Sequence, residues 1–498
     1  MSANARRGAA LDPRTPVLVG GGQLNWRDQP TEPADMVAEA IRAAAADAQA
    51  PQLAAAVESI RLTRILSWRY RDPGLLVGER LGAPVRHTLH TGNGGSHPQA
   101  LVNDAAADIR AGRCDIAVIG GAEAWRTRMA LRRRDERPAW TVQPDDVPEP
   151  ETRPDVPMQD ISEMRAGLDR PAYVYPLFEQ ALRVAAGRAT NEHIDAISRL
   201  WARFSEVAAA NPAAWSPAAV PAEVIAAPGP RNRMIAWPYT KLMNSNNDVD
   251  QAAAVIICSA EAAGRWRVPK DRWVFPLAGA EASDTARIAA RYRLDACPAI
   301  RHAGRLALDL AGVGLAEIGL IDLYSCFPSA VQVAASELGL AANDPGRPLT
   351  ITGGLAFAGG PWNNYSTHAI AAMIGKIRDT GQLGLITANS GYLTKQSIGV
   401  YGPSPGPGFR RGDAGPAVVA EPTTTVAGEY DGPAVLESWT VVFDRDGQPV
   451  KALAALRTGD GARTLARSEE PEIVQRLVTE DAEGTLATVR ADATFRLH

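Results

Sequence analysis

The sequence predicts an α/β layered fold followed by a smaller β-rich domain. Apolar strand-like runs alternate with glycine turns and with amphipathic or alanine-rich helical runs, of which 33–47 and 298–311 are clear examples. The alternation occurs in two stretches, which indicates two similar halves. From about residue 414 the pattern changes to short β-rich runs separated by Asp-Gly turns at 431–432 and 446–447, and such turns are typical of β-hairpins.

Length, composition and charge limit the class of protein. The 498 residues, 46% hydrophobic and 22% charged, are enough to bury more than one core. A formal net charge of −4 argues against a general nucleic-acid role, which needs a dominant basic surface. Residues 1–7 lack the apolar stretch of a signal peptide, and no apolar run is long enough to span a membrane, so we expect a cytoplasmic protein. Neither a metal site nor a disulfide framework is predicted from the spacing of the cysteines, Cys114, Cys258, Cys297 and Cys326.

The segment 91–100 leads into a helical run at the point where a reactive nucleophile would be expected. It reads TGNGGSHPQA and offers glycines instead. The helical run ends at Gly112 and is followed by the apolar strand 116–119 and by the turn Gly-Gly-Ala-Glu at 120–123. Loop, buried helix, strand and Gly-Gly-x-Glu, in this order, resemble the thiolase superfamily.

Further segments carry the same resemblance, which extends from about residue 15 to residue 405. Residues 17–22 resemble the family's opening strand, and residues 247–255 resemble its Asp-Gly-Ala-Ala-Ala entry to the helix that closes the first half. Residues 321–327 resemble its His-Asp-Cys-Phe or Asn-Glu-Ala-Phe motif, and residues 353–361 resemble its Gly-rich segment ending in Gly-His-Pro. Several motifs in the right order are more specific than one. The resemblance implies a thiolase fold, in which two similar βαβ halves form a five-layered α/β body.

The chain departs from the family at its reactive positions. A thiolase carries a nucleophilic cysteine, an activating histidine and a second cysteine, and here the corresponding residues are Gly94 or Gly95, Gly360, and Asn389 or Ser390. A glycine can neither attack a thioester nor move a proton, so classical thiolase activity is not expected. This pattern is similar to the type 1 thiolase-like proteins, which keep the fold, lose the catalytic cysteines and add a C-terminal domain.

We therefore predict three domains. Residues 1–265 form the first half, with a loop excursion at about 126–235, residues 266–413 form the second half, and residues 414–498 form an added OB-like domain, expected as a small β-barrel. That last segment is acidic rather than basic, so nucleic acid is not expected as a partner. The resemblance to type 1 proteins implies a monomer, with a dimer as the alternative.

Tyr324 is the first candidate for catalysis. It resembles the tyrosine of the Tyr-Asp-Cys-Phe motif in thiolase-like steroid side-chain aldolases, which lack the nucleophilic cysteine and cleave a β-hydroxyacyl-CoA by retro-aldol chemistry. Tyr324 would then take the β-hydroxyl proton, while backbone amides of the glycine loops stabilise the enolate oxygen. The chain departs from that motif at Ser325, where the aldolases carry aspartate. The alternative for Tyr324 is a half-buried aromatic side chain beside the pocket.

Three other side chains are candidate catalytic residues, and each has a structural alternative. His97 could act as acid or base, or could line a helix N-terminus. His368, with Asn363 and Asn364 before it, could donate to a thioester oxygen, or the asparagines could be helix caps. Asn389 keeps polarity where the second cysteine is lost, without being a good proton shuttle.

Ligand-binding candidates come from the resemblance. Ser245 and Asn246 lie near the position at which thiolases contact the pantetheine arm of coenzyme A. The glycine loops would line the same ligand through Gly94, Gly95, Gly359 and Gly360. The arginine-rich run 126–134 could hold a phosphate of coenzyme A, or could be a solvated helix face.

The leading functional hypothesis is a thiolase-like protein of lipid metabolism that binds coenzyme A or an acyl-CoA thioester, without a metal. If it is catalytic, we expect a cysteine-independent carbon–carbon lyase or acyltransferase. The second hypothesis is a non-catalytic acyl-CoA binding or scaffolding protein. The third is a hydrolase or acyltransferase that uses Ser96, His97 or Cys326.

Overall fold

The computed structural model describes residues 11–498, so the segment 1–7, on which the expectation about a signal peptide rests, lies outside the described residues. The body contains two five-stranded sheets, with strand orders β1-β7-β4-β2-β3 and β12-β8-β11-β10-β9. The strands of the first are β1 (Pro16–Asn25), β2 (Ser59–Leu62), β3 (His87–His90), β4 (Ile116–Ala124) and β7 (Asp250–Ser259). Those of the second are β8 (Phe275–Ser283), β9 (Ile318–Asp322), β10 (Leu383–Ser390), β11 (Lys395–Gly402) and β12 (Arg410–Asp413).

Four strands of each sheet have the same ladder. β1 pairs antiparallel with β7, β7 antiparallel with β4, and β4 parallel with β2. β8, β11, β10 and β9 repeat these three pairings in the same order. The fifth strands differ, because β3 extends the first sheet beyond β2 whereas β12 lies beside β8 at the opposite edge of the second. The second half therefore has no counterpart of β3 beside β9.

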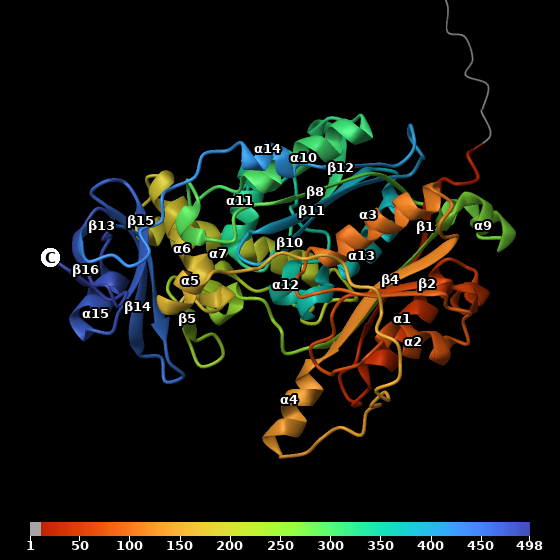
Figure 1. The fold of residues 1–498 in the computed structure, drawn as a ribbon, viewed down its shortest axis with the longest axis horizontal. Helices are drawn as coiled ribbons and strands as arrows, with labels where there is room; N and C mark the ends of the chain where they lie inside the picture. The colour runs from red at the N-terminus through yellow and green to blue at the C-terminus, as the bar shows by residue number, and fades with distance from the viewer. Residues whose placement is uncertain (1–10) are drawn as a thin grey trace, which may run out of the picture.

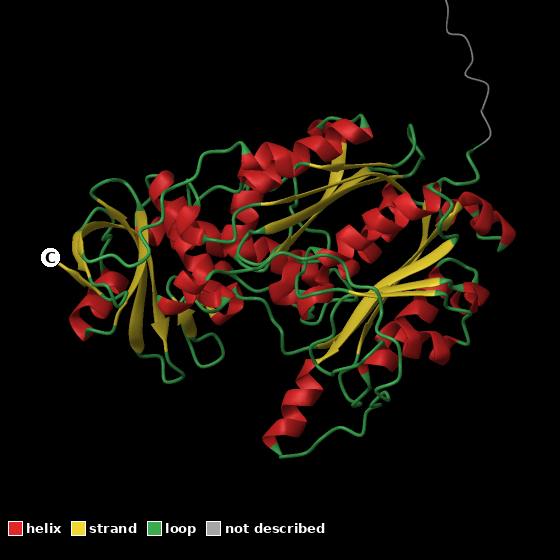
Figure 2. Ribbon diagram, in the orientation of Figure 1, coloured by secondary structure: helices red, strands yellow, loops and turns green. Residues whose placement is uncertain are grey.

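Helices form three layers around the two sheets (Figures 1 and 2). The buried helices α3 (His97–Arg110) and α13 (Tyr365–Thr380) lie between the sheets. The outer faces are covered by α1 (Pro33–Asp47) and α2 (Pro73–Leu81) on the first sheet and by α10 (Pro298–Ala311) and α11 (Pro328–Leu338) on the second. This α/β body of two similar halves confirms the predicted fold class.

Glycine in the opening strand allows the close approach of α1. A Cβ atom on Gly20 would lie 1.9 Å from the carbonyl oxygen of Ala44, and one on Gly22 would lie 2.1 Å from that of Ala40. Any larger side chain would push the helix off the sheet, because packed interiors leave no room for an added methyl group. The glycine run at 20–22 is thus a packing requirement of this layer.

The segment 126–235 contains helices and one long coil. Its helices are α4 (Trp125–Arg133), α5 (Ile161–Arg165), α6 (Pro171–Ala185), α7 (Thr190–Ala209) and α8 (Ala222–Ala226). α4 projects from the body and has no buried residue (Figure 1). In the coil before α5, the backbone of Glu151 pairs with edge strand β3, accepting from His90 N at 2.9 Å and donating to Thr88 O at 3.0 Å. That pairing covers the outer edge of the first sheet.

The C-terminal residues form an antiparallel sheet of order β15-β14-β13-β16-β17, to which β5 adds a bridge from the excursion. Its elements are β5 (Met234–Ala236), β13 (Gly432–Phe443), β14 (Pro449–Thr458), β15 (Arg463–Ser468), α15 (Pro471–Thr479), β16 (Leu486–Val489) and β17 (Phe495–Leu497). The prediction of a barrel needs correction, since no closed barrel occurs within residues 11–498. The end strands are joined only by an isolated bridge between Arg467 and Thr494 rather than by a ladder.

A buried arginine attaches this sheet to the second half. Arg463 is fully buried, forms an ion pair with Glu437 at 2.6 Å, and donates to the carbonyl oxygen of Ala289 at 3.1 Å. A buried charge is tolerated when it is paired in this way. Besides several 3₁₀ turns, the remaining short elements are β6 (Tyr239–Thr240), α9 (Ala260–Arg265), α12 (Gly354–Phe357) and α14 (Gly415–Val419). No helix within the described part of the chain is long and apolar enough to cross a membrane.

Candidate functional site

A cavity of about 440 Å³ lies where the loops of the two halves meet. Its walls come from the loop before α3, the loop after β9, the loop after β10, the turn before α13, and the excursion around α5 and α6. The residues that line it and enter the argument below are Gly94, Gly95, Tyr175, Ser245, Tyr324, Cys326, Asn363, Asn389, Gly391 and Tyr392. Sequence segments more than two hundred residues apart therefore share one pocket.

Tyr324 fills the space that a side chain at position 95 would need. A Cβ atom on Gly95 would lie 2.1 Å from the Tyr324 hydroxyl oxygen and 2.6 Å from its Cζ atom. The tyrosine ring is held by an edge-to-face contact with Tyr365, with centroids 5.5 Å apart. A nucleophilic side chain at position 95 is therefore excluded by the tyrosine, and the phenol group stands in its place at the cavity wall.

The loop before α3 is held by side chains from the second half. Asn363 Oδ1 accepts from Gly94 N at 2.7 Å, Ser390 Oγ accepts from Ser96 N at 2.8 Å, and Ser366 Oγ donates to Gly95 O at 2.9 Å. Within residues 11–498, the backbone N–H groups of Gly95 and Gly391 have no hydrogen-bond acceptor. Two unused donors thus border the same cavity as the Tyr324 hydroxyl.

The Tyr324 hydroxyl and the Cys326 thiol of the wall stay protonated at neutral pH. Burial, and then the nearby Cys326, raises the pKa of the Tyr324 phenol above its ordinary value. Burial likewise raises the pKa of Cys326 to about 12. Both groups are therefore neutral hydrogen-bond donors rather than bases or nucleophiles.

His97 is buried beneath the loop and does not line the cavity. Neither ring nitrogen has a hydrogen-bond partner within the described residues, and Nε2 lies 3.6 Å from Asp155 Oδ2. Burial, and then the charge of Lys395, lowers the pKa of His97 to about 4. Lys395 is itself held by Asp155 Oδ1 at 2.5 Å and by Asn93 O at 3.1 Å.

His368 also lies outside the cavity lining. It is buried on α13, where its Nδ1 is 3.2 Å from Gln23 Oε1, and burial lowers its pKa to about 3. Asn364 is occupied as well, donating to Gly121 O at 2.6 Å and accepting from Thr367 Oγ1 at 2.6 Å. These side chains join α13 to the first sheet.

The remaining predicted residues divide into two groups. Asn389 and Ser245 line the cavity, with Asn389 Nδ2 donating to Tyr175 Oη at 2.8 Å and Ser245 Oγ donating to Cys326 O at 3.1 Å. Asn246, Gly359 and Gly360 lie behind the wall, where Gly360 N donates to Asn246 O at 2.9 Å. A Cβ atom on Gly359, which has φ = 110°, would lie 2.1 Å from Gln251 Oε1. The structure thus brings together Tyr324, Asn389, Ser245, Gly94 and Gly95.

Two tyrosines of the wall were missed from the sequence. Tyr175 belongs to α6 and stacks on Phe327 with centroids 4.5 Å apart, and Tyr392 follows β10 and donates to Gln159 Oε1 at 2.6 Å. Neither is part of a motif, and Tyr175 sits in an apolar helical run that reads as core. Within residues 11–498, no group of three or more His, Cys, Asp or Glu residues could hold a metal ion.

Comparison with known proteins identifies the family of this chain. The family model described as the thiolase-like protein type 1 additional C-terminal domain matches residues 413–494. The crystal structure of a monomeric SCP2-thiolase-like protein type 1 from Mycobacterium smegmatis is 31% identical and superposes with a TM-score of 0.83, covering 98% of this chain and 100% of that one. The chain belongs to the SCP2-thiolase-like protein type 1 family. No functionally curated protein matches it.

More distant structures share the fold of this thiolase-like protein type 1 chain. An Ltp2–ChsH2(DUF35) aldolase is 20% identical with a TM-score of 0.60, covering 78% of this chain and 98% of that one. The dimeric peroxisomal thiolase of Saccharomyces cerevisiae is 12% identical with a TM-score of 0.55, over the same shares of the two chains. Both likenesses extend over the thiolase fold and leave about a fifth of this chain uncovered.

Proposed function

We propose that this cavity binds an acyl thioester of coenzyme A through its carbonyl oxygen. The support is chemical, because three donors border the cavity without a described acceptor: the N–H groups of Gly95 and Gly391 and the neutral hydroxyl of Tyr324. A carbonyl or enolate oxygen is stabilised by such preorganised donors. The single observation that carries the proposal is the Tyr324 hydroxyl in the space of the missing side chain at position 95.

The size of the cavity suits the acyl and pantetheine parts of such a ligand. Ligand pockets of proteins range from about 300 to 1,000 Å³, and this one is mostly apolar with a few convergent polar groups. Ser245 and Asn389 would flank the thioester, and Arg170, which is paired with Asp169 at 2.8 Å, borders the same wall. The nucleotide part of coenzyme A would remain outside, near solvent.

Carbon–carbon cleavage is a second candidate, and its support is the same hydroxyl group. A retro-aldol step needs a base for the β-hydroxyl proton, and Tyr324 is the side chain beside the unused N–H donors. Its raised pKa works against that role, because the phenol must first lose its proton. Non-catalytic binding of the thioester therefore agrees better with the electrostatics of the wall. Acyl transfer through Cys326 is disfavoured by its raised pKa.

The test is calorimetric titration with coenzyme A, acetyl-CoA and a β-hydroxyacyl-CoA, with mass spectrometry of the last mixture. We expect the thioesters to bind more tightly than free coenzyme A, and Tyr324→Phe to weaken them by about tenfold through the loss of one hydrogen bond. Tyr430→Phe, which removes the hydrogen bond of a half-buried tyrosine to Pro433 O before β13, is the control. Equal binding of coenzyme A and its thioesters would reject the carbonyl contact. A shorter thioester plus a carbonyl product would establish the lyase.

We also propose that the chain is monomeric and cytoplasmic. Its relative from M. smegmatis is described as monomeric, and the backbone of Glu151 covers the β3 edge that would otherwise be open to pairing between sheets. All four cysteines are free, as is usual in a reducing compartment. Light scattering coupled to gel filtration tests the oligomeric state, and a mass near twice the 52.9 kDa of the chain would reject the monomer.

A further inference from the structure

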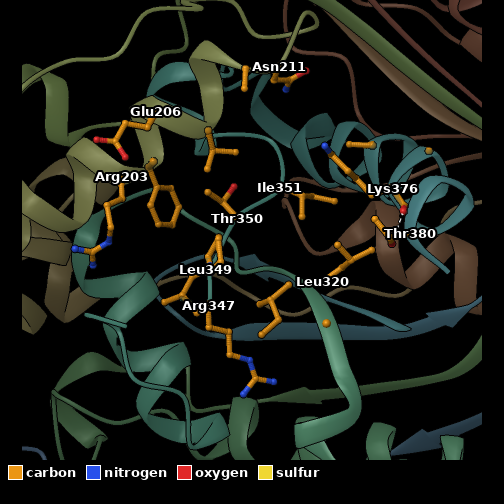
Figure 3. Close-up of a pocket in the computed structure, with 18 of the residues that line it drawn as sticks. Arg203, Glu206, Asn211, Leu320, Arg347, Leu349, Thr350, Ile351, Lys376 and Thr380 are labelled. Atoms are coloured by element: carbon orange, nitrogen blue, oxygen red, sulfur yellow. Dashed lines mark hydrogen bonds between the residues drawn. The ribbon is translucent and has the colours of Figure 1, made fainter. Parts of the chain in front are cut away.

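A second cavity, of about 710 Å³, lies beside the uncovered edge of β9 (Figure 3). It occupies the side on which the first half adds β3 to β2 and the second half adds no strand. The turn before α12 covers only the end of this edge, where Leu323 N donates to Leu349 O at 2.9 Å. The space that remains is bounded by α7, β9, this turn and the C-terminal part of α13. None of the candidate catalytic or ligand-binding residues predicted from the sequence lines it.

The middle of the cavity is apolar. Leu320 from β9 and Leu349 and Ile351 from the turn line it (Figure 3), and Phe204 of α7 also belongs to the lining. Apolar side chains that border an open cavity gain free energy when an apolar ligand removes their surface from water. An aliphatic chain is therefore the chemistry that the walls favour.

The rim carries both signs of charge, and one lysine reaches over the cavity. Arg203 and Arg347 are held by backbone carbonyls, those of Ala342 at 2.9 Å and Ile318 at 3.0 Å, and their charged ends lie away from the middle (Figure 3). Lys376 extends toward Asn211 instead (Figure 3). Lys395 and Lys451 are paired with carboxylates, whereas Lys376 forms no ion pair within residues 11–498.

The acidic residues of the rim limit the charge of the ligand. Glu206, Asp344 and Asp379 border the same cavity and would repel a phosphate or any other polyanion. A single carboxylate beside Lys376 meets a cation, and the acidic rim repels one negative charge less than it repels a polyanion. The ammonium group can donate to the carboxylate in a charge-assisted hydrogen bond.

We propose that this cavity binds an aliphatic carboxylate, with the chain along β9 and the head group at Lys376. The site is separate from the thioester cavity and does not depend on it. Its polar wall nevertheless adjoins the 321–327 motif that carries Tyr324. Thr350 donates to Asp322 Oδ2 at 3.0 Å, and Tyr365 donates to Asp322 Oδ1 at 3.1 Å.

Titration of the full chain with decanoate, decanol and acetate, followed by calorimetry, tests the proposal. We expect decanoate to bind with one site, decanol about five- to tenfold more weakly because it lacks the charge, and acetate not at all. Lys376→Gln should reduce decanoate binding to the decanol value and leave decanol unchanged. Lys241→Gln, at an exposed lysine away from the cavity, is the control and should change neither.

Gly375→Leu is the second variant. Gly375 lines the cavity from α13, and an added Cβ there meets nothing within 4 Å, so the leucine fills the cavity while favouring the helix. Binding of decanoate should be lost while the melting temperature is kept. Tyr324→Phe should leave decanoate binding intact, which separates this site from the thioester cavity. No saturable decanoate binding, or binding that survives Gly375→Leu, would overturn the proposal, and equal affinity for decanol would overturn the role of Lys376.

Discussion

The two halves share a strand ladder but differ at the entries to their buried helices. Before α3, Gly94 and Gly95 leave room that the Tyr324 hydroxyl and the cavity occupy. Before α13, Asn363 and Asn364 fill the corresponding region and use their amides on the first half, on Gly94 N and Gly121 O. The α3 entry therefore borders an open cavity, while the asparagines of the α13 entry join the two halves by hydrogen bonds. Similar topology thus does not imply similar roles for equivalent loops.

The buried hydrogen bonds of Asn364 predict the largest effect on stability. Asn364→Ala removes the buried hydrogen bonds to Gly121 O and from Thr367 Oγ1, and it should lower the free energy of unfolding by about 3 kcal/mol because the partners stay buried and unpaired. Urea unfolding measures the change. Asn191→Ala, at an exposed asparagine, is the control. An equal loss in the free energy of unfolding for both variants would show that the Asn364 hydrogen bonds do not stabilise the contact between the halves.

At the α3 entry, the close approach of Tyr324 to Gly95 predicts a steric clash for any side chain at position 95. Gly95→Ala should cost about 2–3 kcal/mol, since its Cβ would overlap Tyr324. Gly264→Ala, where an added Cβ meets nothing within 4 Å, should be neutral or stabilising. In a double-mutant cycle with Tyr324→Leu, a favourable coupling of 1 kcal/mol or more, roughly the scale for residues in contact, is expected. Additive costs would mean that Tyr324 does not occupy this space.

The buried histidine at the α3 entry predicts a dependence on pH. The unfolded chain binds a proton at His97 below its ordinary pKa of 6.5, but the folded chain does so only below about 4. Between these values the unfolded state holds more protons, so His97 lowers stability as the pH falls, by up to about 2 kcal/mol at pH 5. His97→Phe should remove this part of the pH dependence. Parallel stability curves for the variant and the wild type from pH 7 to 5 would contradict the prediction.

The smallest effect is expected at the hydrogen bond between Ser390 and the α3 loop. Ser390→Ala leaves Ser96 N without its acceptor, removes the contact between the two serine hydroxyls, and should cost about 1 kcal/mol in unfolding experiments. Ser283→Ala, at an exposed strand end, serves as the matched change. If Ser390→Ala also leaves thioester binding unchanged, the loop keeps its conformation without the hydrogen bonds between Ser390 and Ser96.

Local patterns were sufficient for much of the fold. The glycine run at 20–22, the helical runs 33–47 and 298–311, and the order of the motifs predicted the two halves, because side-chain period and glycine placement act within one element. Closure of the C-terminal sheet was predicted wrongly, since it depends on how its end strands meet. The single bridge between Arg467 and Thr494 has no local signal.

The predicted residues of the site show the same division. Tyr324, Asn389 and Ser245 line one cavity because motif loops at the ends of neighbouring strands meet there. His97 and His368 have suitable chemistry but lie outside the lining, because the direction of a side chain on a buried helix depends on what packs around it. Whether any of these residues acts in catalysis stays a prediction.

The sequence by itself determined the family, the absence of a cysteine nucleophile and the alternation of strands and helices, since each is written in residue type and spacing. Only the tertiary structure decided that the Tyr324 hydroxyl occupies the space beside Gly95. It also decided that Tyr175 completes the wall and that a cavity opens beside β9 where the first half has β3. The physical reason is that these features join segments far apart in the chain. Excluded volume and burial act between such segments only after the layers have packed.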